Sequence, residues 1–401
     1  MQQAPQDPLQ AAAQSGDMNR LFTEIVARAV ERGASDVHLE PTEDGMNVRI
    51  RVHGLLEDLL QLTDEAQKNF IRAVKVKFNI DSTARLPQDG RYTGNISGHE
   101  FHLRGASMPQ VHGDKMVLRI LDKGQMMSID QLGLSPQNLA GFRHMLERPH
   151  GLVLITGPTG SGKTTTLYAA LSYLMSPHKN ICTVEDPVEF YLQGVNQVQV
   201  HSKIGLTFSS VLQALLRQDP DIIMVGEIRD KDTAEIAIHA ALTGHLVLST
   251  LHTNNTVGAI ARLIDLGVTP FLLCSALNGV MAQRLAQRLC PSCRQPMAAP
   301  YDSWYQARGC SECQGKGSQG RVTVQELLPM TDEFLHAIMS LHAIDATQLN
   351  QLAVNTGMVS LQDDALHKAM QGLLTYQEAV RVTQGHIAEA SQQTAEVESP
   401  A

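Results

Sequence analysis

Apolar and polar residues follow two different patterns along the chain, and each pattern predicts its own kind of fold. Residues 21–29 repeat apolar side chains at helical spacing, and Gly33 can end that helix. Residues 46–52 instead place an apolar side chain at every second position, as a half-buried strand does. Because similar alternation continues downstream, we predict a small α+β domain over residues 18–122.

The middle of the chain predicts a different architecture, because short apolar runs rich in β-branched residues alternate there with helical patterns. The runs between residues 138 and 289 are 152–156, 181–184, 221–225 and 246–250. This order is typical of a parallel sheet flanked by helices. The predicted fold class is therefore α/β, with the smaller α+β domain preceding it.

The remaining segments complete the predicted organisation. Residues 290–326 carry four cysteines, and residues 327–384 return to a helical pattern. The other segments are a disordered lead over 1–17, a linker over 123–137 and a disordered tail over 385–401.

Composition limits the classes of partner. The chain has 401 residues, 43% of them apolar, so it can build a sizeable core. Its formal charge of −9 argues against a general affinity for nucleic acid or anionic lipid. We find neither an apolar run of about 18 residues nor a secretory signal. We therefore predict a cytoplasmic protein that binds no nucleic acid and does not span a membrane.

The most informative motif follows the first apolar run of the α/β region. Residues 157–164 fit the pattern G-x-x-x-x-G-K-[ST] between a strand and a helix. Backbone N–H groups of such a loop turn inward and form an anion site with the helix N-terminus. The predicted nucleotide-binding residues are Gly157, Pro158, Thr159, Gly160, Ser161, Gly162, Lys163, Thr164 and Thr165. Among them, Lys163 would reach the β- and γ-phosphates of ATP, and Thr164 would hold Mg²⁺.

Two acidic clusters stand at the ends of later strands. Glu185 closes the run 181–184, and Glu227 follows the run 221–225. Ligands of an open α/β sheet bind outside the carboxyl ends of its strands, so both carboxylates are expected near the phosphate loop. One would coordinate Mg²⁺, and the other would activate the attacking water. The residues alone leave the assignment open; our hypothesis gives the water to Glu185 and the metal shell to Glu227.

A histidine stands at each end of the run 246–250. Two interpretations of His245 and His252 remain open at this point. Either both are structural residues, or the pair senses the γ-phosphate of the bound nucleotide.

Four cysteines form the pattern C-x₂-C-x₁₆-C-x₂-C, which lies within the spacing of structural zinc sites. The predicted Zn²⁺ ligands are Cys290, Cys293, Cys310 and Cys313. Four thiolates close a tetrahedral shell, so the metal is expected to be structural and not catalytic.

These motifs together resemble those of the secretion and pilus assembly ATPases, the motor proteins of type II secretion and type IV pilus biogenesis. The resemblance covers roughly residues 18–385. Its segments are 33–41, 86–91, the Walker A loop 157–164, an aspartate box at 185–189, a Walker B region at 216–230 and a histidine box at 243–254. The four cysteines look like those of the assembly branch of that superfamily.

The resemblance implies a homo-hexameric ring that works with an inner-membrane platform protein. Each subunit would join a PAS-like N-terminal domain to a RecA-like P-loop ATPase domain with a zinc-binding insert and a C-terminal helical region. ATP would bind between the two domains. Arg91 and Arg104 of the first domain would then reach the phosphates, and Arg217 and His252 would act at the same site. Such arginines neutralise transition-state charge and link hydrolysis to movement.

Two departures from the family pattern keep alternatives open. Gln213 stands where the family usually has an arginine, and only 17 residues precede the PAS-like domain, so an N-terminal docking module is expected to be missing. One alternative is a nucleotide-binding regulatory subunit with weak or no turnover. A nucleic-acid motor is the other, although 4% aromatic residues argue against stacking surfaces for bases.

Overall fold

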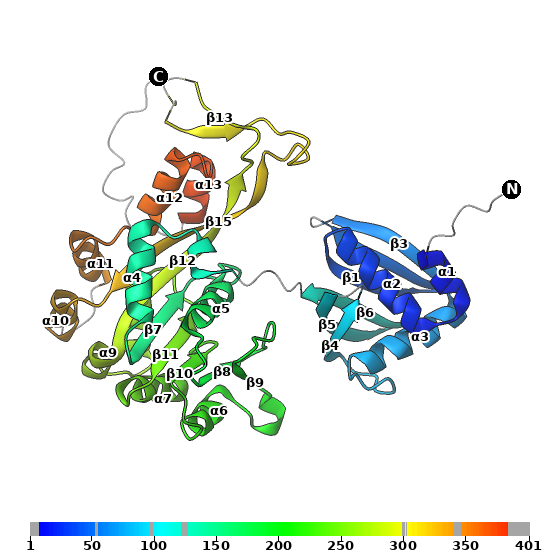
Figure 1. Ribbon diagram of the computed structural model, residues 1–401, viewed down its shortest axis with the longest axis horizontal. Coiled ribbons are helices and arrows are strands. Elements are labelled where there is room, and N and C mark those ends of the chain that lie inside the picture. Colours follow the sequence, from blue (N-terminus) through cyan, green and yellow to red (C-terminus); the bar gives the residue numbers. More distant parts are fainter. Residues whose placement is uncertain are drawn as a thin grey trace. The chain divides into compact units, whose positions relative to one another are not determined.

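The computed structural model describes residues 8–52, 55–96, 99–121, 127–298, 301, 303–340 and 346–383. The chain divides into two compact units, Met1–Gln125 and Met126–Ala401, each described by itself below (Figure 1). Three parts of the predicted organisation lie outside the described residues. They are the tail over 385–401, the start of the lead over 1–7, and residues 123–126 of the linker.

Unit 1 is built on an antiparallel sheet whose described strands are ordered β3-β2-β1-β6-β5-β4. The strands are β1 Ala34–Thr42, β2 Gly45–Val52, β3 Leu55–Thr63, β4 Gln88–Ile96, β5 His99–Gln110 and β6 Gly113–Leu121. The helices are α1 Pro8–Ser15, α2 Met18–Glu31 and α3 Asp64–Lys77. This arrangement matches the α+β domain predicted from alternation.

Alternation along the strands of unit 1 separates a core face from a polar face. Val37 and Leu39 on β1 are fully buried in the core that α2 and α3 complete. The flanking residues Asp36 and Glu40 lie on the opposite face and pair with basic side chains of β2 and β6. A period of two therefore accounts for both faces of the sheet.

The prediction of a disordered lead is wrong for residues 8–15, which form α1. Leu9 and Ala12 of this helix are buried in the core of unit 1. The Ala- and Gln-rich composition suggested disorder, but Ala and Gln are also good helix formers once an apolar face is covered.

Unit 2 is built on a mostly parallel sheet with the described strand order β15-β12-β7-β11-β10-β8-β9. The strands are β7 Gly151–Thr156, β8 Ile181–Glu185, β9 Asn196–Gln199, β10 Ile222–Val225, β11 Leu246–Leu251, β12 Leu277–Leu289 and β15 Ser318–Pro329. The strand β15 pairs antiparallel with β12 at one edge. A separate small hairpin, β13 Arg294–Pro296 with β14 Tyr305–Ala307, lies in the cysteine segment.

Helices cover both faces of this sheet, so its central strands are apolar on both sides. The helices are α4 Pro136–Leu146, α5 Lys163–Leu174, α6 Phe208–Leu215, α7 Lys231–Leu242, α8 Thr256–Asp265, α9 Pro270–Ala276, α10 Asp332–Ser340, α11 Ala346–Asn355, α12 Leu361–Met370 and α13 Tyr376–Thr383, with short 3₁₀ turns η1 Ile129–Leu132 and η2 Ser202–Ile204. On β7, Leu152 and Leu154 enter one core, whereas Val153 and Ile155 enter the other. This continuous burial is typical of parallel sheets.

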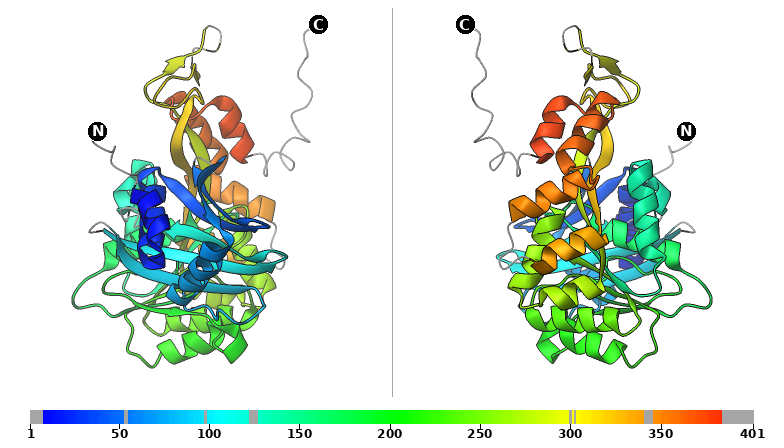
Figure 2. Two further views of the ribbon diagram at one scale, coloured as in Figure 1. Left: turned by 90° about the vertical axis from the view of Figure 1, so that its right-hand side faces the viewer. Right: turned by 90° about the vertical axis from the view of Figure 1, so that its left-hand side faces the viewer.

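Two predicted boundaries shift in unit 2. Ile129 and Leu132 of η1 are buried in the core beside α4, so the described part of the predicted linker already belongs to this unit. The cysteine segment, predicted over 290–326, ends earlier because β15 begins at Ser318. Beyond it, α12 packs on β15 and α13 on β12, which places these helices beside the long edge strands (Figures 1 and 2).

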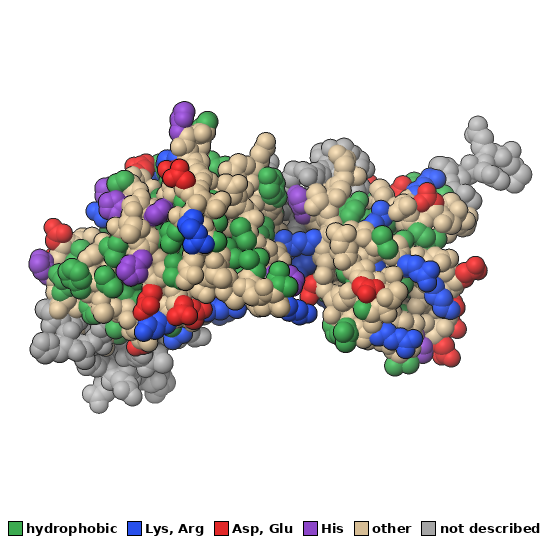
Figure 3. Space-filling view, turned by 90° about the horizontal axis from the view of Figure 1, so that it is seen from below, with side chains coloured by type: hydrophobic (Ala, Val, Ile, Leu, Met, Phe, Trp, Pro, Cys, Tyr) green, Lys and Arg blue, Asp and Glu red, His purple; other side chains and the backbone are tan. Residues whose placement is uncertain are grey.

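The surface carries both signs of charge. On the face shown in Figure 3, basic and acidic side chains are interspersed. Among the described residues, none of the helices has the length and apolar run that crossing a bilayer requires.

Candidate nucleotide-binding site

The phosphate loop lies where the sequence predicts it, between the buried strand β7 and the helix α5. Gly157, Gly160 and Gly162 have φ values of 150°, 78° and 88°, which favour glycine. A Cβ on Gly157 would come within 2.4 Å of the Gln283 carbonyl oxygen. The loop therefore needs glycine both for its backbone conformation and for its close approach to β12.

Gln283 of β12 fixes this loop from behind. Its Nε2 donates to the Ser161 carbonyl oxygen at 2.7 Å, and its Oε1 accepts from the Thr166 hydroxyl at 2.8 Å. The side chain is buried. The loop is thus preorganised by a strand distant in sequence, which the local motif could not reveal.

Lys163 stands at the first position of α5 and is half-buried. Its Nζ donates to the carbonyl oxygens of Gly157 at 2.7 Å and Pro158 at 3.1 Å. Burial lowers the pKa of this ammonium, which the charge of Glu227 partly opposes. A desolvated cation in this position is a strong partner for an anion that enters the loop.

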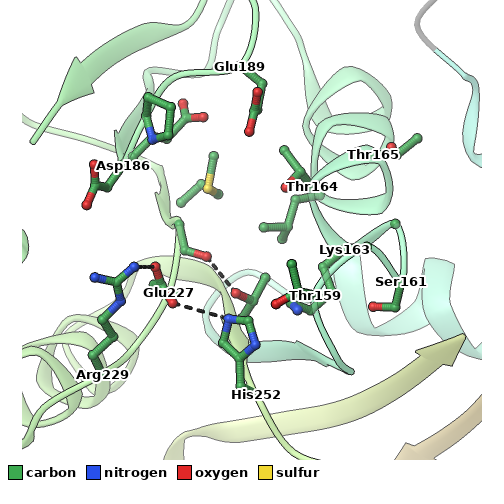
Figure 4. A pocket seen from close by; sticks show the side chains of 18 of the residues that line it. Thr159, Ser161, Lys163, Thr164, Thr165, Asp186, Glu189, Glu227, Arg229 and His252 are labelled. Carbon is green, nitrogen blue, oxygen red and sulfur yellow. Dashed lines mark hydrogen bonds and ion pairs between the residues drawn. The ribbon is translucent and has the colours of Figure 1, made fainter. Parts of the chain in front are cut away.

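Glu227 follows β10 and lies opposite the loop in a cluster of charged groups. Arg229 pairs with one of its carboxylate oxygens, and His252 Nε2 lies 3.3 Å from the other (Figure 4). His252 comes from the carboxyl end of β11, so parallel neighbours deliver both groups to one edge of the sheet.

Glu185 occupies the end of β8, but its carboxylate is almost completely buried. The Tyr168 hydroxyl donates to its Oε2, and its Oε1 accepts from Thr183 Oγ1 at 2.6 Å and Gln197 Nε2 at 3.1 Å. Four residues later, Glu189 is exposed and points into the cavity toward Thr164 (Figure 4). Glu185 lies at the sheet edge where the sequence predicts it, but both of its carboxylate oxygens accept hydrogen bonds from neighbouring side chains.

A cavity of about 540 Å³ joins these groups. Of the residues predicted to bind nucleotide, Thr159, Gly160, Ser161, Gly162, Lys163, Thr164 and Thr165 line it, together with the predicted catalytic residues Glu185, Glu227 and His252. Gly157 and Pro158 contribute carbonyl groups to the base of the loop. Four further charged residues line the cavity, although none of them is assigned a role from the sequence: Asp186, Glu189, Arg229 and Arg321.

The two histidines that bracket β11 have different surroundings. His252 lines the cavity, whereas His245 lies at the opposite end of the strand with its Nδ1 2.9 Å from the Ala240 carbonyl oxygen. Of the two histidines, only His252 therefore lies beside the phosphate loop in this unit.

Arg217 does not line the cavity of its own unit. It follows the C-terminal end of α6 and is exposed, as is Gln213 on the same helix. Gln213 therefore leaves the lining of this cavity unchanged.

Arg91 and Arg104 belong to unit 1, where they are direct neighbours across the sheet. Arg91 on β4 is opposite Arg104 on β5, and Arg104 is opposite Arg119 on β6. Arg104 lies 3.7 Å from Asp89, and Arg119 donates to Asp36 at 2.9 Å. The three guanidinium groups thus form a row on the polar face of this sheet.

The four cysteines converge, and their sulfur atoms all lie within 4.8 Å of one another. The Sγ–Sγ distances are 3.8 Å for Cys290–Cys310, 3.8 Å for Cys293–Cys313 and 3.7 Å for Cys310–Cys313. A tetrahedral zinc site with Zn–S bonds of about 2.3 Å has S–S edges of about 3.8 Å. Backbone N–H groups of Cys310 and Gly317 lower the pKa of Cys313, whereas burial and hydrogen bonds with the neighbouring thiols raise the pKa of Cys293.

The fold and the cavity define a P-loop nucleotide-binding protein of the α/β class. The family model described as Type II/IV secretion system protein matches residues 11–381. The chain therefore belongs to the type II/IV secretion system protein family.

Named relatives agree with this assignment. The chain is 43% identical to the type II secretion system ATPase E of Vibrio cholerae over 379 residues, which cover 91% of this chain and 75% of the relative. It is 43% identical to the type IV pilus assembly ATPase PilB of Myxococcus xanthus over 393 residues, covering 93% and 69%. The ADP-bound pilus retraction motor PilT has a similar structure, with a TM-score of 0.70, 27% identity and coverage of 90% and 96%.

Proposed function

We propose that this protein is a Mg²⁺-dependent motor ATPase that drives protein secretion or the assembly of pilins or pseudopilins. The observation that carries the proposal is the single cavity in which the phosphate loop, two acidic strand ends and His252 meet. Relatives named as a secretion ATPase and a pilus assembly ATPase match more than nine tenths of the chain. Together they support ATP as the substrate and mechanical work as the purpose of its hydrolysis.

In this proposal, the residues of the loop bind and orient the triphosphate. The N–H groups of the loop and the start of α5 surround the phosphates, and Lys163 leaves its carbonyl partners to neutralise the β- and γ-phosphates. Thr164 and Glu227 line the same cavity and carry the oxygen ligands that Mg²⁺ prefers, so they would hold the ion. When bound, Mg²⁺ would offset the phosphate charge.

The attacking water needs a carboxylate that can reach it. Glu185 was our first candidate, but its two oxygens accept hydrogen bonds from three side chains. Glu189 is exposed in the cavity, which makes it the better candidate for orienting the water. We assign Glu185 to holding this segment in place, and His252 to sensing the γ-phosphate through its contact with Glu227.

Motor function requires that hydrolysis move one part of the assembly against another. We propose a homo-hexamer that acts at the cytoplasmic face of the inner membrane on a platform protein. Arg91 and Arg104 would contact the phosphates when unit 1 closes on a nucleotide. The triphosphate would then add an anionic partner to two arginines that lie directly opposite each other on β4 and β5. Arg217, which does not line the cavity, is given no role at this site.

The direct test of the site is the variant Lys163→Ala, measured by phosphate release with Mg²⁺ and ATP. We expect kcat to fall at least about a hundredfold, because the loop loses the cation that stabilises transition-state charge. Lys203, on the exposed turn η2, provides a matched control, since Lys203→Ala removes a lysine outside the cavity. An unchanged rate in Lys163→Ala would place hydrolysis elsewhere.

We propose a structural Zn²⁺ at the four cysteines. Elemental analysis of the purified protein should find about one zinc per chain. The double variant Cys310→Ser with Cys313→Ser should lose it, whereas Cys274→Ser, at a cysteine buried beside α10, should keep it. A folded wild-type protein without zinc would contradict the proposal.

A further inference from the structure

We propose that Tyr168 is a positioning residue for hydrolysis, which links the phosphate-loop helix to the acidic segment 185–189. The inference rests on the proposed function. It concerns a residue that the helical pattern marks only as part of the core.

Tyr168 lies on α5, four residues after Thr164 and therefore about one helical turn from the phosphate ligands. Its side chain is 1% exposed. Burial, and then the neighbouring charge of Glu185, raise the pKa of its hydroxyl. The group therefore stays protonated and acts as a hydrogen-bond donor throughout the working pH range.

The hydroxyl of Tyr168 makes contact with both ends of the acidic segment. It donates to Glu185 Oε2, and it accepts from the Glu189 backbone N–H at 3.3 Å. The ring packs edge-on against Phe190, with the ring centroids 4.4 Å apart. One side chain thus bridges the side-chain oxygen of Glu185 and the main chain of Glu189.

This bridge has a consequence for the cavity. Thr164, at the start of α5, and Glu189, at the end of the acidic segment, both line it. Because the Tyr168 hydroxyl fixes the Glu189 backbone relative to α5, it sets the distance between the phosphate end of the helix and the Glu189 carboxylate. A misplacement of about 1 Å can lower the rate of a positioned reaction about a hundredfold.

The variant Tyr168→Phe separates positioning from core packing, because it keeps the ring and removes only the hydroxyl. The chain provides a matched control in Tyr173, on the same helix, whose hydroxyl donates to Glu147 at the surface. Tyr173→Phe deletes the same kind of tyrosine–glutamate hydrogen bond outside the cavity.

The experiment measures kcat and KM for MgATP in the wild type, Tyr168→Phe and Tyr173→Phe, with the Kd of a fluorescent, non-hydrolysable ATP analogue. We expect Tyr168→Phe to lower kcat at least tenfold while KM and the analogue Kd stay within twofold, and Tyr173→Phe to match the wild type. If Tyr168 had only a structural role, Tyr168→Phe would instead lower the fraction of protein molecules that bind nucleotide. Titration with the ATP analogue measures that fraction. If Tyr168→Phe keeps the wild-type kcat, or if both variants lose kcat equally, the inference about Tyr168 is wrong and the proposed function still stands. If the wild type binds ATP but never hydrolyses it, both the inference and the proposed function are wrong.

A second measurement on the wild type covers the case in which Tyr168→Phe fails to fold. Amide hydrogen exchange of the peptide containing Glu189 should be slower than the unprotected rate, because the Glu189 N–H donates to the Tyr168 hydroxyl. It should slow further when the ATP analogue binds, because the analogue stabilises the loop helix that carries Tyr168. Exchange of that amide at its unprotected rate, with analogue bound, would show that the bridge is absent and would overturn the inference.

Discussion

The two sheets of this protein differ in where their acidic side chains lie. The antiparallel sheet of unit 1 leaves one face polar, so Asp36 and Glu40 lie in the middle of strand β1 and pair across the sheet. The parallel strands of unit 2 are covered on both faces, and the carboxylates that line its cavity, Glu185 and Glu227, stand at or just beyond strand ends. The antiparallel sheet of unit 1 therefore carries charged pairs on one face, whereas the parallel strands of unit 2 bring carboxylates to the edge where they end.

The comparison also explains why unit 2 alone carries the cavity described here. Parallel strands bring the ends of β7, β8, β10 and β11 to one edge, where segments distant in sequence meet. Unit 1 instead offers a row of arginines across neighbouring strands. One unit can build a pocket, and the other can present a charged surface.

The largest expected effect on stability lies in unit 2, at the buried carboxylate of Glu326. It accepts from the Thr256 N–H at 2.7 Å and the Leu361 N–H at 3.2 Å, so it joins the N-terminal ends of α8 and α12. Glu326→Ala leaves these buried donors unpaired and should cost about 3–5 kcal/mol of unfolding free energy. Urea unfolding measures this change in unfolding free energy, and amide hydrogen exchange shows whether the lost stability lies in unit 2.

The matched control for this prediction is Glu235→Ala. Glu235 is an exposed glutamate 3.5 Å from Lys231 on α7. Its removal should change the unfolding free energy by less than about 0.5 kcal/mol. Equal losses in the two variants would mean that the buried carboxylate does not join the helices as described.

A smaller effect is expected in unit 1, where the buried Lys75 pairs with Asp114 at 2.6 Å. Asp114→Ala should cost about 2 kcal/mol, because it strands a buried ammonium, whereas Lys75→Met should stay within about 1 kcal/mol. Urea unfolding of both variants, with exchange measured on α3 and β6, compares them. A greater loss in Lys75→Met than in Asp114→Ala would contradict this explanation.

The smallest effect is the contribution of a single unit 1 carboxyl, that of Asp36, to the pH dependence of stability. Burial tends to raise the pKa of Asp36, but hydrogen bonds from Ser35 and Arg119 outweigh it, so the pKa is lowered in the folded state. The carboxylate therefore stabilises the fold above the unfolded pKa of about 3.9 and loses this contribution as pH falls below it. The urea midpoint of unit 1 should therefore fall as the pH drops from about 4 toward the lowered pKa of the folded state.

Asp36→Asn is the variant that isolates this contribution. It should make the acid limb of the unit 1 curve shallower without abolishing it, because the pKa of Glu40 is also lowered, and it should leave the unit 2 curve as in the wild type. A wild-type midpoint in unit 1 that rises on acidification would reverse the sign of the argument.

Local patterns predicted the local parts of this structure. The phosphate loop needs glycines and a lysine in sequence, so residues 157–164 identified it without tertiary information. The strand β12 was missed, because its polar Gln283 and Arg284 interrupt the apolar run. Gln283 is polar because it holds the loop, and this contact spans 122 residues of the chain.

Predictions for single carboxylates were less complete, since the sequence shows which acids follow a strand but not which donors surround them. Glu185 was expected to face the water, yet Tyr168, Thr183 and Gln197 donate to its oxygens. Only the placement of α5 and β9 beside β8 brings those donors together. The same holds for His245 and His252, which the sequence treats alike and the sheet separates by the length of a strand.

The central claim is that ATP binds in the cavity at the carboxyl edge of the unit 2 sheet. A crystal structure of the protein with Mg²⁺ and a non-hydrolysable ATP analogue tests it most directly. We predict the triphosphate within the loop 157–164, with Lys163 moved from the Gly157 carbonyl oxygen to a phosphate. Nucleotide bound in another cavity, with Lys163 still on its loop carbonyl groups, would contradict the account.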